Sequence, residues 1–167
     1  LHQGALAGSA LSLRNSIVSN GTLTTAGVPA ASRDLYQPGG ATVTSLGYNV
    51  VQVRSAATGW SATDAPNGTD PQLAALAANG GPTPTHALPA ASPAVNLVPL
   101  AACVDAAAAP LLRDQRGIAR QVGGDPCDAG SYERASIGMT PATLADARVG
   151  SAYSATLAGV GGTAPYA

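Results

Sequence analysis

Residues 12–20 (SLRNSIVSN) and 45–53 (SLGYNVVQV) are the two stretches that indicate the fold. Each alternates apolar and polar residues over a short run, which is typical of strands. The stretches align at an offset of 33 residues, with these matched positions: Ser12 with Ser45, Leu13 with Leu46, Ile17 with Val50, and Val18 with Val51. The segment between them is rich in turn signals, including Asn-Gly and Pro-Gly-Gly. Successive coils of a parallel β-helix would produce this order of strand, long loop and similar strand.

The charge of the chain limits its class of partner. The 167 residues include eight basic residues, all of them Arg, and nine acidic residues, for a net charge of −1. Nucleic acids and anionic membranes both attract clustered Lys and Arg, so we expect neither as a partner. The longest weakly polar run, residues 97–112, contains Asp105, Pro99 and Pro110. It is too short and too interrupted to span a bilayer, so we expect no membrane insertion.

The apolar residues of the chain are mostly small. Ala and Gly are abundant and Phe is absent, although large apolar side chains contribute roughly 1.5–3 kcal/mol each when fully buried. The core must therefore consist of thin layers of Val, Leu, Ile and Ala, which favours a narrow stacked structure over a wide globule. The chain begins at Leu1 without Met or a charged and apolar leader, so we interpret it as an excised fragment.

Residues 60–96 have a different character, with six of the 13 prolines. The segment DPQLAALAANG, residues 70–80, predicts a short helix. Asp70 would cap it, Pro71 would occupy its first position and Gly80 would end it. The rest of this region predicts turns and extended chain.

Beyond Arg134 the pattern changes to that of an all-β module. Apolar and polar residues alternate, with Tyr153, Ala155 and Leu157 on one face, and residues 161–163 (GGT) predict a turn. A complete immunoglobulin-like sandwich takes about 100 residues, so this module is cut short. We expect a frayed tail after Arg134.

Two parts of the chain resemble known families. Residues 12–133 resemble the carboxy-terminal end of bacterial right-handed β-helix proteins called choice-of-anchor Q proteins. The segments that carry this resemblance are, in order, LRNSIVSN, VTSLGYNVV, GWSATD, GTDPQLAALAANGGPTPTHALPAASPAVN, C…DQRGIAR and CDAGSYE. Residues 138–166 are similar, through PATLADARVGSAYSATLAGVGGTAPY, to the start of an immunoglobulin-like domain found in arrays on bacterial surface proteins.

These resemblances imply a fold and a location. The first implies a pectin-lyase-like fold and an extracytoplasmic protein, at the cell surface or secreted, with no catalytic residues to carry over. The chain departs from the family in an Ala-rich insert between Cys103 and Asp114. We expect an all-β chain, in which residues 1–134 form the last coils and the loop-rich C-terminal cap of a right-handed parallel β-helix. Residues 135–167 would be the N-terminal part of a partial Ig-like β-sandwich.

Cys103 and Cys127 are the only cysteines of the chain. An even pair in an exported protein indicates a structural disulfide. The alternatives are two buried free thiols or half of a metal site. The metal alternative is the weakest, because His2 and His86 are distant and there is no C-x-x-C pair.

Eight charged residues gather between Arg113 and Arg134. Six of them are candidates for the acid and base set of a polysaccharide lyase or hydrolase: Asp114, Arg116, Arg120, Asp125, Asp128 and Glu133. The carboxylates alternate with Arg and Gly in a turn-rich tail, however, which favours ion pairs that fix loops to a neighbouring coil. We therefore expect Asp114, Arg116, Asp128 and Glu133 to be structural residues of the cap.

Several other polar residues have structural interpretations. His86 lies between prolines without a nucleophile signature nearby, so we expect a hydrogen-bonded structural histidine. Asp64, Asn67 and Asp70 faintly resemble a calcium loop but lack the EF-hand spacing, so we expect Asx-turns. Asn15 and Asn49 are expected at turns between coils, where their side chains would satisfy backbone groups.

The expected function is structural or adhesive. The last coil of a β-helix exposes apolar side chains and an unpaired strand edge, which invite aggregation unless they are covered. We expect residues 60–134 to be this cover, in a non-catalytic chain without cofactor or metal whose unidentified extracellular ligand is a glycan or a protein surface. One alternative is a carbohydrate-active enzyme whose groove lies outside these residues, and another is a calcium-stabilised stalk. The fold alone does not choose among them.

Overall fold

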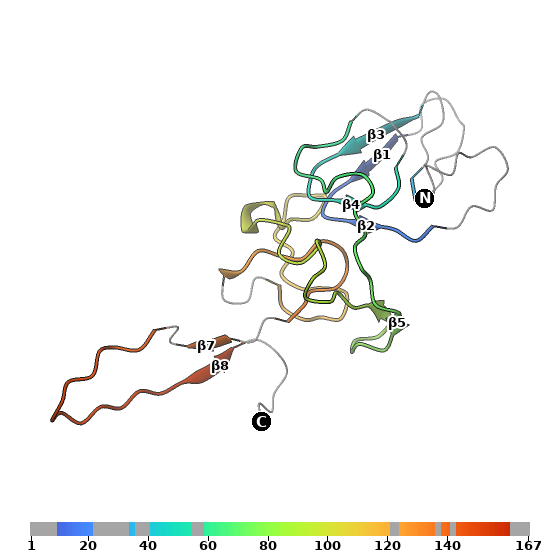
Figure 1. Cartoon of the computed structure of the whole chain (residues 1–167). Coiled ribbons are helices and arrows are strands. Elements are labelled where there is room, and N and C mark those ends of the chain that lie inside the picture. The colour runs from blue at the N-terminus through green and yellow to red at the C-terminus, as the bar shows by residue number, and fades with distance from the viewer. Residues whose placement is uncertain are drawn as a thin grey trace.

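The computed structural model describes residues 10–21, 34–35, 41–54, 59–120, 124–135, 138–140 and 143–160 (Figure 1). The regular elements among these residues are short strands and one 3₁₀ turn, so the expected all-β class is confirmed. The strands are β1 (Ala10–Leu13), β2 (Ile17–Val18), β3 (Thr42–Ser45), β4 (Val50–Val51), β5 (Leu76–Ala77), β6 (Thr85–His86), β7 (Gly138–Thr140) and β8 (Ala158–Val160), and the 3₁₀ turn is η2 (Leu100–Ala102).

The two stretches that opened the sequence analysis form two parallel strand pairs, β1 with β3 and β2 with β4. Ile17 pairs with Val50 and Val18 with Val51, as the offset of 33 predicts. The predicted register is wrong by one residue in the first pair, where Leu13 faces Ser45 instead of Leu46. Leu46 is consequently outside the core and 47% exposed.

The corner that follows the first pair explains this shift. One more residue separates β3 from β4 than separates β1 from β2, and the longer corner absorbs it through positive φ angles at Gly47 and Tyr48. The buried side chain of Asn49 fills the corner: its Oδ1 accepts the N–H of Ser16 at 2.9 Å, and its Nδ2 donates to the carbonyl of Leu13 at 3.2 Å. Side-chain hydrogen bonds therefore replace backbone pairing where the register changes.

Residues 59–68 form a third layer along β3 and β4 without becoming a regular strand. Three backbone hydrogen bonds of 2.8–2.9 Å attach this layer to the preceding one, and they run from Ser45 N to Gly59 O, from Ala65 N to Asn49 O and from Gly68 N to Gln52 O. Trp60 packs against the apolar interior, and the guanidinium of Arg54 lies 4.3 Å from the centre of its ring. The edge of the second layer is therefore covered by backbone and by an aromatic side chain.

The strand pair β2–β4 separates two apolar cores. On one face, Val18 and Val51 pack with Leu13, Leu35 and Val43 inside the layered strands. On the other face, Ile17 and Val50 pack with a second core that residues 65–129 supply. The alternation of side chains along a strand thus directs adjacent residues into different cores. Residues 94–134, which we call the C-terminal segment, pack beside the strand layers (Figure 1, yellow to orange).

The helix predicted for residues 70–80 is absent, and this prediction was wrong. Asp70 accepts the N–H of Gln72 at 2.8 Å in an Asx-turn, and Gln72 itself has a φ of +55°, which ends any helical path. β5 instead pairs with β6 in an antiparallel hairpin, with Leu76 opposite His86. Leu76 is 60% exposed, so the segment buries no apolar stripe that would stabilise a helix.

The β7–β8 hairpin projects away from the rest of the protein (Figure 1). Residues 143–159 between and within its strands are all exposed, including Tyr153 at 45% and Leu157 at 50%. Of the alternating residues 153–158, only Ala158 lies in a strand, β8, and among the described residues no second sheet covers either face of the alternating pattern. The turn predicted at residues 161–163 lies outside the described residues.

Candidate functional site

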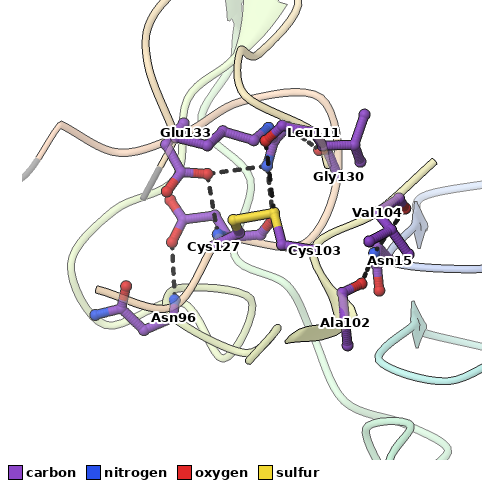
Figure 2. Close-up of a disulfide and its surroundings, with 11 residues drawn as sticks. Asn15, Asn96, Ala102, Cys103, Val104, Leu111, Cys127, Gly130 and Glu133 are labelled. Atoms are coloured by element: carbon purple, nitrogen blue, oxygen red, sulfur yellow. Dashed lines mark hydrogen bonds and ion pairs between the residues drawn. A yellow bond between two sulfur atoms is a disulfide. The ribbon is translucent and has the colours of Figure 1, made fainter. Parts of the chain in front are cut away.

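Cys103 and Cys127 form a disulfide, as predicted, with Cα atoms 6.1 Å apart (Figure 2). Both residues are buried in the second core. The backbone of Cys127 exchanges two hydrogen bonds with Val98, at 2.9 and 3.0 Å, and the carbonyl of Cys103 accepts the N–H of Leu111 at 2.9 Å. The disulfide therefore cross-links backbone segments that already pair, which limits how far they separate when the chain opens.

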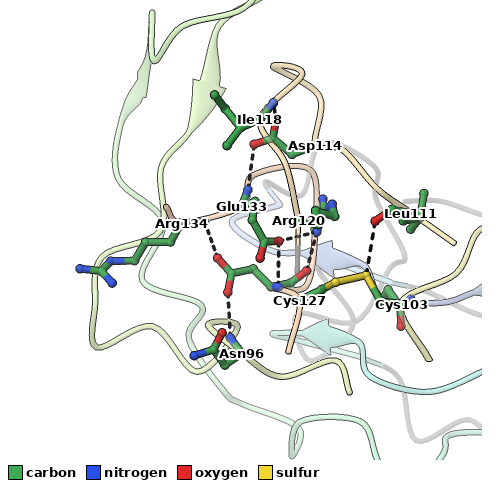
Figure 3. Close-up of polar contacts among 12 residues, drawn as sticks. Asn96, Cys103, Leu111, Asp114, Ile118, Arg120, Cys127, Glu133 and Arg134 are labelled. Atoms are coloured by element: carbon green, nitrogen blue, oxygen red, sulfur yellow. Dashed lines mark hydrogen bonds and ion pairs between the residues drawn. A yellow bond between two sulfur atoms is a disulfide. The ribbon is translucent and has the colours of Figure 1, made fainter. Parts of the chain in front are cut away.

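Arg120 is the centre of a buried polar network beside the disulfide (Figure 3). Its guanidinium donates to the carbonyls of Asp128 at 2.9 Å and Gly130 at 2.7 Å, and to the carboxylate of Glu133 at 2.9 Å. The same Glu133 oxygen accepts the N–H of Asp128 at 3.0 Å. One arginine thus holds three points of the loop that follows Cys127.

Asp114 and Arg116 extend this network across the chain. The carboxylate of Asp114 accepts the N–H groups of Arg116, Ile118 and Glu133 at 2.8–3.0 Å. The Arg116 guanidinium pairs with Asp114 at 2.7 Å and donates to the carbonyl of Glu133. It also lies 3.6 Å from the centre of the Tyr132 ring, a cation–π distance.

Asp128 completes the set by accepting the N–H groups of Asn96 at 2.8 Å and Arg134 at 2.5 Å. The structure therefore brings together Asp114, Arg116, Asp128 and Glu133, the residues singled out for the cap. Asp125 is exposed and stands outside these contacts. Sequence reasoning placed Arg120 only among catalytic candidates and overlooked its central position, because its partners are mostly backbone carbonyls that carry no sequence signal.

The carboxylates of the network differ in their pKa values. Burial raises the pKa of Glu133 from 4.5 to about 7, and the charges of Asp128 and Asp114 add to this effect, against the N–H of Asp128 and the charge of Arg120. Burial also raises the pKa of Asp128, against the N–H groups of Arg134 and Asn96. For Asp114 burial acts in the same direction, but hydrogen bonds from Glu133, Arg116 and Ile118 outweigh it and lower the pKa. The carboxylates of Asp114, Asp128 and Glu133 lie near the guanidinium groups of Arg116 and Arg120. Of the three, Glu133 has the most strongly raised pKa.

We expect the folding stability to decrease as the pH rises from 4.5 to about 7 because of Glu133. Folding raises its pKa above the ordinary value of 4.5 to about 7, so folding favours the protonated form. The contribution of Glu133 to folding stability is complete when the pH is below its ordinary pKa of 4.5, and it is lost as the pH rises through about 7. Denaturant unfolding of the wild type and of Glu133→Gln across this pH range measures the free energy of unfolding. For the variant, this free energy should change less with pH. An unchanged slope in the variant would assign the effect to another group.

The remaining candidates bond to nearby backbone. His86 Nδ1 lies 2.7 Å from the carbonyl oxygen of Ala74 and donates to it, since a carbonyl oxygen can only accept. Asp64 accepts N–H groups of Asn49 and Ser61 at 2.9 Å, and Asn67 accepts that of Arg54. Within the ranges that the structure describes, no three His, Cys, Asp or Glu side chains lie so that they could hold a metal ion.

Both corner asparagines satisfy backbone groups. Asn15 has a φ of +49°, and its Nδ2 donates to the carbonyl of Ala102 at 2.8 Å (Figure 2). The backbone of Asn15 also accepts the N–H of Gly130 at 2.8 Å and donates to Gly47 at 3.1 Å. The corner at Asn15 therefore joins the strand layers to two separate parts of the C-terminal segment.

A groove of about 650 Å³ lies beside β2, and the sequence analysis contains no prediction of it. Its walls come from residues 15–20, from the β5–β6 hairpin and from residues 129–132, and none of its lining residues is Asp, Glu or Arg. Most of its polar lining is hydroxyl or amide, and its volume falls within the ~300–1,000 Å³ typical of ligand sites. Its walls are far apart in the chain, so no local motif marks it.

No model of a known protein family, no curated protein and no solved structure matches this chain. In the part of the chain that the structure describes, no helix is long and apolar enough to cross a membrane.

Proposed function

We propose that this chain is a non-catalytic structural segment of an exported, surface-displayed or secreted β-helix protein. In this proposal residues 1–134 are the last coils and the cap of a right-handed parallel β-helix. Two features support it: β1 and β2 pair in parallel with strands that lie 32 and 33 residues further along the chain, and residues 59–68 continue the layering. The resemblance to choice-of-anchor Q proteins rests on the sequence segments quoted above.

The observation that carries the capping role is the attachment of the C-terminal segment at Asn15. Gly130 and Ala102 both bond to this corner residue, and the disulfide and the Arg120 network fix the chain on either side of those contacts. The second core then covers Ile17 and Val50, which would otherwise expose the outer face of β2–β4 to water. Such a cover keeps this apolar face of the strand pair from associating with other chains.

A non-catalytic role is supported by how the acidic residues are used. Asp114, Asp128 and Glu133 bond to backbone N–H groups and arginines, and none of them lines the groove. We assign residues 135–167 as the start of an immunoglobulin-like module, because Arg134 makes the last hydrogen bond of the network and the projecting β7–β8 hairpin follows.

Reduction of the disulfide is the experiment that tests the capping role. Reduction is expected to cost about 3.5 kcal/mol of folding stability, because it frees a closed loop of about 25 residues in the unfolded chain. Amide exchange should become faster at residues 94–134 and also at β2 and β4, since the second core covers those strands. Denaturant unfolding and hydrogen exchange with and without reductant measure both effects.

The two cysteines are the only ones in the chain, so reductant acts at a single bond. The intact mass of the natively produced protein should increase by two hydrogens on reduction. If exchange accelerates only near Cys103 and Cys127 while β2 and β4 keep their protection, the segment is a local loop and the capping role is wrong.

A further inference from the structure

The chain contains two Asp-Pro bonds, which join Asp70 to Pro71 and Asp125 to Pro126. The nitrogen of such a bond is a tertiary amide nitrogen. It takes up a proton more readily than the nitrogen of a secondary amide, so it leaves more easily as an amine. The aspartate before it carries a nucleophile of its own, since the side-chain carboxylate can attack the backbone carbonyl of the same residue. Self-cleavage therefore depends on whether the carboxylate is free to reach that carbonyl.

The surroundings of the Asp70–Pro71 bond oppose this reaction. Oδ1 of Asp70 accepts the N–H of Gln72 at 2.8 Å, and this hydrogen bond must break before the carboxylate can turn to its own carbonyl. Pro71 is fully buried, and its carbonyl accepts the hydroxyl of Ser92 at 2.6 Å. Both the nucleophile and the leaving amine of this bond are therefore held in place.

The Asp125–Pro126 bond lies in an open part of the C-terminal segment. Asp125 is exposed, and none of the residues that the structure describes bonds to its carboxylate. The preceding Gly124 is exposed as well, and a Cβ added to it would meet nothing within 4 Å. Pro126 is only half-buried. The carboxylate of Asp125 can therefore rotate toward its own carbonyl, and the new chain end at Asp125 can move away after cleavage.

We propose that the chain cleaves its own Asp125–Pro126 bond and that the disulfide keeps the two products together. A side-chain oxygen of Asp125 attacks the backbone carbonyl carbon of the same residue and forms a C–O bond. The C–N bond to Pro126 breaks, and the proline nitrogen takes a proton from the solvent and leaves as an amine. Water then opens the cyclic anhydride of Asp125 to two carboxyl groups, so that one water molecule is consumed in total.

The position of this bond inside the disulfide loop determines the result of cleavage. Cys103 precedes the bond and Cys127 follows it, so the two products remain covalently joined. Cys127 also exchanges two hydrogen bonds with Val98, which hold the Pro126 side of the cut in place. Arg120 belongs to the first product and still donates to the loop that follows Cys127. The site does not depend on the capping role, because these contacts all lie within the C-terminal segment.

The test uses the full chain, incubated in mildly acidic acetate buffer to supply the proton for the leaving nitrogen. Without reductant, the intact mass should increase by the mass of one water molecule. With reductant, the cleaved protein should separate into residues 1–125 and 126–167. The Asp70–Pro71 bond of the same molecule is the internal control. It should be cleaved about tenfold more slowly, because one hydrogen bond must break first.

Three further measurements identify the cause of this difference. In denaturant at the same acidity, the two Asp-Pro bonds should be cleaved at similar rates, because the contacts of Asp70 and Pro71 are lost. Asp125→Glu keeps the charge but places the nucleophile differently, so cleavage should slow by about tenfold or more. Pro126→Ala replaces the tertiary amide with a secondary amide and should also slow cleavage. Asp125→Glu changes an exposed side chain without a described partner, so we expect the fold to persist.

Cleavage that continues at the same rate in Asp125→Glu would assign the cut to ordinary acid hydrolysis or to a protease and would overturn the proposal. Equal rates for the two Asp-Pro bonds in the folded protein would overturn it as well. So would an Asp125–Pro126 bond that stays intact in the folded protein. Separation of the two products without reductant would show that the disulfide does not join them.

Discussion

Gly59→Ala is expected to destabilise the protein by about 3–5 kcal/mol, a loss that combines backbone strain with a steric clash. Gly59 has a φ of +101°, and an added Cβ would lie 2.2 Å from the carbonyl oxygen of Val43. That carbonyl is backbone within β3 and cannot move without disturbing the strand pair. The change therefore separates the third layer from the second at the bond between Ser45 and Gly59. Denaturant unfolding followed by circular dichroism measures the loss.

Gly68→Ala is the matched control for this prediction. Gly68 has a similar φ of +91° and belongs to the same layer, but an added Cβ meets nothing within 4 Å. Its cost should be about 1 kcal/mol, from the strain of a side chain at positive φ alone. Equal losses for the two variants would mean that residue 59 does not approach β3 closely, and the layered arrangement of residues 59–68 would be wrong.

Arg120→Met is expected to cost a similar amount, about 3–5 kcal/mol, for an electrostatic reason. Met has nearly the volume of the arginine stem but donates no hydrogen bond. The carboxylate of Glu133 and the carbonyls of Asp128 and Gly130 would each lose a donor in a site that is largely closed to water. Thermal or denaturant unfolding measures the loss, and hydrogen exchange should locate it in residues 124–135.

Arg113→Met is the control, because Arg113 is exposed and donates to the carbonyl of Gly117 at its own turn. Surface changes of this kind alter stability by about 0.5 kcal/mol or less. The double variant Arg120→Met/Glu133→Gln should be more stable than Arg120→Met alone, since it removes the buried charge of Glu133 that Arg120→Met leaves without a guanidinium partner. If the double variant is no more stable than Arg120→Met, the lost donors to the carbonyls dominate and the charge of Glu133 contributes little.

The strand layers are covered in two directions by two different segments. Residues 59–68 lie along the edge of β3 and β4, whereas residues of the second core lie against the outer face of β2–β4. The sequence predicts residues 60–134 as one cover over the end of the stack. The division arises because Val50 and Val51, adjacent in one strand, point to opposite faces and need separate apolar partners.

Features that depend on short-range pattern or on counting could be predicted from the amino-acid sequence. Alternation in residues 12–20 and 45–53 was enough to predict the all-β class and the pairing of Ile17 with Val50, because period-two alternation is a property of neighbouring residues. An isolated pair of cysteines, in a chain expected outside the cytoplasm, was enough to predict the Cys103–Cys127 bond. The high density of charged residues in this part of the chain was also enough to predict a group of structural residues there, namely Asp114, Arg116, Asp128 and Glu133.

The other features could not be predicted, because the contacts that produce them join residues far apart in the chain. The register of β1 and β3 depends on the Asn49 side chain, which bonds to Leu13 and Ser16. The helix expected at residues 70–80 gives way to a hairpin because the segment has no apolar face to bury there. Arg120 becomes the centre of the network through carbonyls, and the groove beside β2 forms where distant segments meet. Backbone groups look alike in every sequence, so only the fold determines which of them come together.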